Sequence, residues 1–107
     1  MPIICRLIEE PSSYMETHPG DIWFINRDQG LLSAYYREHN SHRKPLMVKL
    51  PSGDFFCVDG PCYSAEQGAY GGWQVTGEAP NITVAPSIHL VGRYHGFLTN
   101  GVLSDPL

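Results

Sequence analysis

The sequence has few charged residues and no excess of positive ones. Lys and Arg number 7 against 11 Asp and Glu, which gives a formal net charge of −4 at pH 7. Nucleic acids and anionic membranes attract basic proteins, so this balance argues against both as general partners. No apolar run approaches the length of a membrane span, and the N-terminus lacks a basic segment followed by a long apolar one. We therefore expect a protein that acts in the cytoplasm without membrane contact.

Cysteine is also scarce, with only three residues in the chain. An odd and small number does not fit a disulfide framework, so reduced thiols are expected. Turn-forming residues are abundant instead: 11 glycines and nine prolines, 20 of 107 residues, break the chain into short elements and argue against a helical bundle. A chain of 107 residues has room for one core, so residues 1–107 are expected to form a single domain.

Short β-rich runs separated by turn signals dominate the chain. The pattern predicts strands within residues 3–10, 21–26, 45–50, 54–59, 73–77, 81–91 and 93–104, with a hairpin at Asn100-Gly101, and a short helix over residues 31–39. Residues 60–72 form the longest irregular stretch. The expected fold is a small, mainly β domain of antiparallel hairpins, in the form of a partly closed barrel with one short α-helix. An α+β fold is the alternative.

Two histidines fall inside these predicted strands. Strand side chains alternate between faces, so Val84 and Ile88 share an apolar face while His89 lies on the other. In the last hairpin, Tyr94 lies on the apolar face and His95 on the opposite one. Unless a bulge shifts this alternation, both imidazoles lie outside the core. They are then either ordinary exposed residues or parts of one site.

One such site would bind a metal. Cys57 and Cys62 together with His89 and His95 give the pattern C-x4-C…H-x5-H, and thiolates with imidazoles are the ligands that Zn²⁺ prefers. The cofactor expectation is therefore none or zinc. In the alternative interpretation, Cys57 is a buried thiol that behaves as a small apolar residue, and the other three are unrelated to it.

A thiol enzyme is a further hypothesis. Cys62 would be the nucleophile of a small hydrolase or transferase, His95 its base and Asp59 the group that orients the imidazole. No paired carboxylates indicate acid–base catalysis, so a non-enzymatic role is favoured.

One local basic segment departs from the acidic average. Residues 37–44 read REHNSHRK, and Arg37, Arg43 and Lys44 could contact an acidic partner or a phosphate. The alternative is a solvated loop after the helix.

The C-terminal third of the chain carries three distinctive motifs. They are W-x-V-T-G-E-x-P at residues 73–80, T-V-x-P-S-I at residues 83–88, and Y-H-G-x-L…G-V-L at residues 94–103. In these the chain resembles a family of small phage and prophage proteins of unknown function. Some members are labelled ammonia monooxygenase, a chemistry that no residue pattern of this chain supports. The resemblance implies a phage-derived accessory protein that acts in the host cytoplasm.

A wider group that the chain resembles more distantly has a cysteine-rich cluster and a later Cys and His, which implies zinc binding. Here Cys57 and Cys62 stand for the cluster and His95 for the later histidine, while Gly92 occupies the place of the later cysteine. The favoured function is thus a phage-derived interaction protein that binds a host or phage protein. The alternatives are a zinc-stabilised β module and the Cys/His enzyme.

Overall fold

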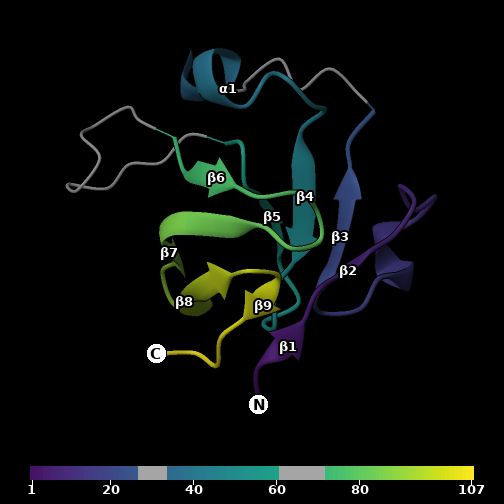
Figure 1. The fold of residues 1–107 in the computed structure, drawn as a ribbon. Coiled ribbons are helices and arrows are strands. Elements are labelled where there is room, and N and C mark those ends of the chain that lie inside the picture. The colour runs from purple at the N-terminus through teal and green to yellow at the C-terminus, as the bar shows by residue number, and fades with distance from the viewer. Residues whose placement is uncertain (27–33, 61–71) are drawn as a thin grey trace.

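Two β-sheets make up most of the structure (Figure 1). The computed structural model describes residues 1–26, 34–60 and 72–107. The first sheet has five strands in the order β1 (Ile3–Ile4), β9 (Val102–Leu103), β8 (Tyr94–Thr99), β7 (Thr83–Leu90) and β6 (Gln74–Thr76). The second has four, in the order β2 (Arg6–Leu7), β3 (Asp21–Phe24), β4 (Leu46–Lys49) and β5 (Phe55–Cys57). The prediction of a mainly β fold is confirmed.

Helical structure is limited to two short elements in the described residues. These are a 3₁₀ turn, η1 (Tyr14–Glu16), and the helix α1 (Ala34–His39). α1 coincides with the second part of the predicted helix, and residues 31–33 lie outside the described part. The hydroxyl of Tyr36 donates to the main-chain oxygen of Arg43 at 2.6 Å, which fixes α1 to the segment before β4. Neither helical element is long and apolar enough to cross a membrane.

The N-terminal segment joins the two sheets. The sequence predicts one strand over residues 3–10, and this prediction is wrong in detail, because β1 belongs to the five-stranded sheet and β2 to the four-stranded one. The change occurs at Cys5, whose N–H donates to Gly101 at 2.7 Å, while the next N–H, that of Arg6, donates to Gly20 at 3.0 Å. Strands β5 and β6 end their sheets without pairing to each other, so the two sheets do not form a closed barrel.

Both predicted hairpins form. β4 and β5 pair antiparallel around a turn in which Gly53 donates to Leu50 at 2.9 Å, and β8 and β9 pair around Asn100-Gly101. Asn100 and Gly101 have φ angles of 46° and 75°, as expected when a two-residue turn has positive φ at both positions. The predicted irregular stretch 60–72 lies mostly outside the described residues.

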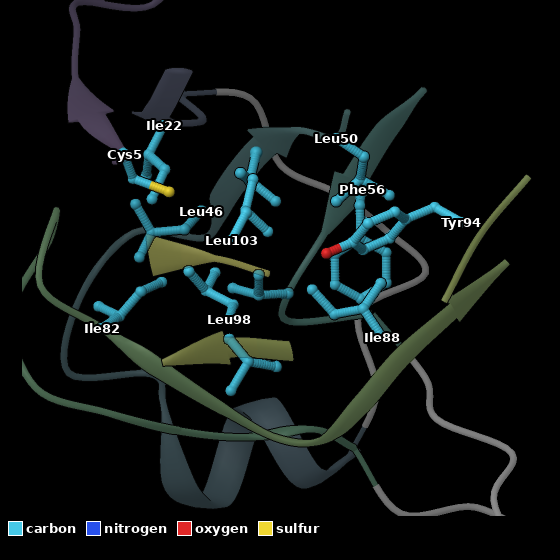
Figure 2. Packing of buried hydrophobic residues seen from close by; sticks show 13 residues of the cluster. Cys5, Ile22, Leu46, Leu50, Phe56, Ile82, Ile88, Tyr94, Leu98 and Leu103 are labelled. Atoms are coloured by element: carbon cyan, nitrogen blue, oxygen red, sulfur yellow. The ribbon is translucent and has the colours of Figure 1, made fainter. Parts of the chain in front are cut away.

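The core lies between the sheets. Figure 2 shows side chains of both sheets meeting there, including Ile22 and Leu46 from one and Ile88 and Leu98 from the other. Burial of each such side chain stabilises the fold by roughly 1.5–3 kcal/mol. The remaining buried members are Cys5, Val48, Leu50, Phe56, Val58, Ile82, Val84, Tyr94 and Leu103.

Candidate functional site

His89 and His95 lie directly opposite each other on β7 and β8. Their ring centroids are 4.2 Å apart and the planes are 21° from parallel, so the imidazoles stack. The neighbouring residues Ile88 and Tyr94 are buried in the core, which places both histidines on the outer face of the five-stranded sheet. The Nε2 atom of His95 lies 3.1 Å from the Ser87 hydroxyl. The predicted outward orientation is confirmed.

A bulge in β7 does not change this orientation. Val84 pairs with Leu98 and Ile88 with Gly96, so three residues of β7 stand opposite Phe97 alone. β7 therefore contains two extra residues. Since side chains alternate with a period of two, an even insertion leaves the later residues on the same face.

The third described member of the predicted metal site lies elsewhere. Cys57 is in register with Met47 and, through it, with Trp23, whereas the neighbouring Phe56 is in the core. Its side chain thus belongs to the outer face of the four-stranded sheet, and the core separates it from His89 and His95.

No group of three or more His, Cys, Asp or Glu residues in residues 1–26, 34–60 and 72–107 is arranged to hold a metal ion. Cys62, the fourth predicted ligand, lies outside those residues. Two stacked imidazoles beside a hydroxyl fall short of the four ligands of a structural zinc site.

The described thiols are not activated as nucleophiles. Burial raises the pKa of Cys5 to about 11. Burial also raises the pKa of Cys57, although main-chain hydrogen bonds from Asp59 and Gly60 act in the opposite direction. Both thiols are therefore protonated at neutral pH, and the thiolate is the reactive form.

Asp59 binds Arg43, whereas the thiol-enzyme hypothesis requires it to bind His95. Its carboxylate accepts two hydrogen bonds from the Arg43 guanidinium, at 2.9 and 3.1 Å, and one from the N–H of Leu46 at 2.8 Å. The Asp59 side chain is 0 % exposed and that of Arg43 is 15 % exposed. The carboxylate thus holds the segment before β4, whereas the described side-chain neighbours of His95 are Ser87 and His89.

The same contact changes the interpretation of the basic segment. Arg43 is engaged by Asp59, and the Nζ atom of Lys44 donates to Asn26 at 2.6 Å. Arg37 is exposed on α1. Arg43, one of the three predicted partner contacts, therefore stabilises the fold, because its guanidinium neutralises the buried carboxylate of Asp59.

A different surface carries main-chain groups that have no hydrogen-bond partner among the described residues. β2 is the end strand of its sheet and pairs parallel with β3 (Figure 1). The N–H groups of Arg6 and Ile8 donate to Gly20 and Ile22 at 3.0 and 2.8 Å. Because alternate residues of a strand direct their main-chain groups to opposite sides, the N–H and C=O of Leu7 point away from β3.

Beside this edge lies a groove of about 620 Å³. It is lined by apolar side chains and by two glutamates, and Leu7 is 41 % exposed. The described residues that line it are Leu7, Ile8, Glu9, Glu10, Phe24 and Asn26. We call this surface the β2 edge. No local sequence pattern identifies it, because a strand becomes an end strand only through the order of strands in the sheet.

Comparison of the chain with protein-family models, with curated proteins and with solved structures finds no match.

Proposed function

We propose that the chain is a non-enzymatic interaction protein that binds an extended segment of a partner protein along the β2 edge. The supporting observation is the end strand itself, whose main-chain N–H and C=O groups at Leu7 point away from β3, next to a groove lined by apolar side chains and glutamates. An added strand would satisfy these groups and cover the exposed part of Leu7. The resemblance to small phage proteins supports a phage or host polypeptide as the partner, met in the host cytoplasm.

Asp59, the residue that would orient the base of the predicted thiol enzyme, binds Arg43 instead, and the predicted nucleophile Cys62 lies outside the described residues. The β2 edge, in contrast, combines outward main-chain hydrogen-bonding groups with the partly exposed apolar side chain of Leu7, and an extended peptide pairs with such an edge through both.

The test uses a display library of random decapeptides selected on the chain. Each selected peptide is measured by NMR titration against the native chain and against Leu7→Pro. Proline at Leu7 removes the outward N–H and the leucine side chain but none of the hydrogen bonds to β3, so the variant should fold, and its circular dichroism and thermal unfolding verify this. We expect Leu7→Pro to weaken binding at least ten-fold.

Leu7→Ala is the matched control, because it shortens the same side chain and keeps the N–H. We expect it to weaken binding less than Leu7→Pro does. In the native chain, the amide shifts should move at residues 7–10 and at Phe24. Peptides that bind Leu7→Pro as tightly as the native chain, or a selection that yields none, would overturn the proposal.

A further inference from the structure

The side chains of the β2 edge define what an added strand must carry. Leu7 is in register with Ile22, a core residue, so its side chain faces the inner side of the sheet. Glu9 follows two residues later on that side, and Ile8 lies on the opposite one. A strand paired with β2 would therefore meet an apolar side chain at Leu7, another at Ile8, and a carboxylate at Glu9.

The two glutamates that line the groove differ in their surroundings. Glu10 accepts hydrogen bonds from the main-chain N–H and the side-chain amide of Asn26, at 3.3 and 2.9 Å. Glu9 is exposed, and its carboxylate has no hydrogen-bond or ion-pair partner among the described residues. Opposite charges that face each other across a pair of strands stabilise the pairing, and like charges destabilise it. Glu9 is thus the group that selects the charge of an incoming segment.

We propose that the β2 edge binds, antiparallel to β2, an extended segment in which a Lys or Arg is followed by two apolar residues. The basic residue lies opposite Glu9, and the two apolar residues lie opposite Ile8 and Leu7. This assignment rests on the proposed function. Antiparallel pairing is the slightly more stable arrangement per residue, and β-branched residues fit the apolar positions best.

A second copy of the chain fits this edge less well. In an antiparallel pair of β2 strands centred on Leu7, Glu9 of one copy would stand opposite Cys5 of the other, and in a pair centred on Glu9 the two Glu9 carboxylates would face each other. Arg6, the basic residue of β2, already contacts Asp21 at 3.1 Å. The chain as a whole is also acidic, with a formal net charge of −4. Charge complementarity therefore favours a basic partner segment.

Three blocked octapeptides test the inference by NMR titration. Each has threonine at its ends, and the central residues are Lys-Val-Ile, Glu-Val-Ile or the reversed order Ile-Val-Lys. We expect the Lys-Val-Ile peptide to bind at least ten-fold tighter than the Glu-Val-Ile peptide and tighter than the reversed one. Glu9→Lys should invert the preference between the first two peptides, whereas Glu16→Lys, which reverses an exposed charge on η1, should not.

The outcomes separate this inference from the proposed function. If all three peptides bind the native chain equally and none binds Leu7→Pro, strand addition is supported. The preference for a basic residue opposite Glu9 is then overturned. A preference for the reversed peptide would overturn the antiparallel orientation. Self-association that rises with concentration and disappears in Leu7→Pro would assign the edge to a second copy. If neither these peptides nor any library peptide binds, both proposals fail.

Discussion

At the scale of single residues, the buried contact between Arg43 and Asp59 shows how local charge can mislead. In the sequence, Arg43 belongs to a basic segment that is expected to be exposed. In the fold, its guanidinium binds the carboxylate of Asp59, which is 0 % exposed. Two parallel N–H···O bonds of this kind fix geometry as well as charge. The pair therefore positions the start of β4, through the third bond from the Leu46 N–H.

We predict that Arg43→Met destabilises the fold by about 3–5 kcal/mol, because it leaves the Asp59 carboxylate buried without a counter-charge. The double variant Arg43→Met/Asp59→Asn should recover much of this loss, since asparagine keeps an acceptor for the Leu46 N–H and carries no charge. Urea unfolding of the native chain and of both variants measures the free energies. A loss below about 1 kcal/mol in Arg43→Met, the range of an exposed pair, would show that this pair is not buried.

At the scale of elements, the hairpins depend on glycines whose surroundings differ. Gly101 and Gly92 both have a φ angle of 75°. A Cβ atom on Gly101 would lie 2.6 Å from the main-chain oxygen of Pro80, whereas one on Gly92 would meet nothing within 4 Å. The turn at Gly101 is thus packed against the segment around Pro80, and the turn at Gly92 is open to solvent on that side.

Alanine substitutions at Gly92 and Gly101 separate the cost of the positive φ angle from the cost of the steric clash. Gly92→Ala should cost about 1–2 kcal/mol, the penalty of a left-handed conformation for a residue with a Cβ. Gly101→Ala should cost at least about 1 kcal/mol more, because main-chain atoms must move to relieve the clash. Urea unfolding checks both values. Equal losses would mean that the turn around Gly101 shifts freely, and hence that it does not anchor the end of the five-stranded sheet.

The elements also show which features can be read from the sequence. The hairpins around Gly53 and Gly101 were predictable, because a turn and its flanking strands are encoded within a dozen residues. The outward face of His89 and His95 was predictable from alternation alone. The local pattern of residues 3–10 wrongly predicts one strand, because the step between sheets at Cys5 depends on partners at Gly20 and Gly101, which no local pattern specifies.

The candidate site illustrates the same limit. Residue types placed Cys57 with His89 and His95, but whether three strands bring their side chains together depends on which sheet and which face each occupies. Cys57 and the histidines lie on opposite outer faces, with the core between them. The β2 edge was missed for the related reason that an end strand is a property of strand order.

At the scale of the whole molecule, the two sheets share one buried cluster, and the chain passes between them twice, at Cys5 and between β5 and β6. Residues of the five-stranded sheet, such as Leu98 and Ile88, pack into the same cluster as Ile22 and Val48 of the four-stranded sheet. Neither sheet can bury its apolar face without the other. This arrangement implies that the sheets unfold together.

Shortening a core side chain of one sheet should therefore destabilise the other sheet as well. Leu98 is 0 % exposed and belongs to the five-stranded sheet, whereas the equally buried Trp23 belongs to the four-stranded one. Leu98→Ala should lower the free energy of unfolding by about 2–5 kcal/mol through the cavity it leaves. In a Trp73→Phe background, the fluorescence of Trp23 and the far-UV circular dichroism should move to the same lower urea midpoint. A Trp23 transition that stays at its original midpoint would show that the four-stranded sheet folds without its neighbour, and would divide the chain into two cooperative units.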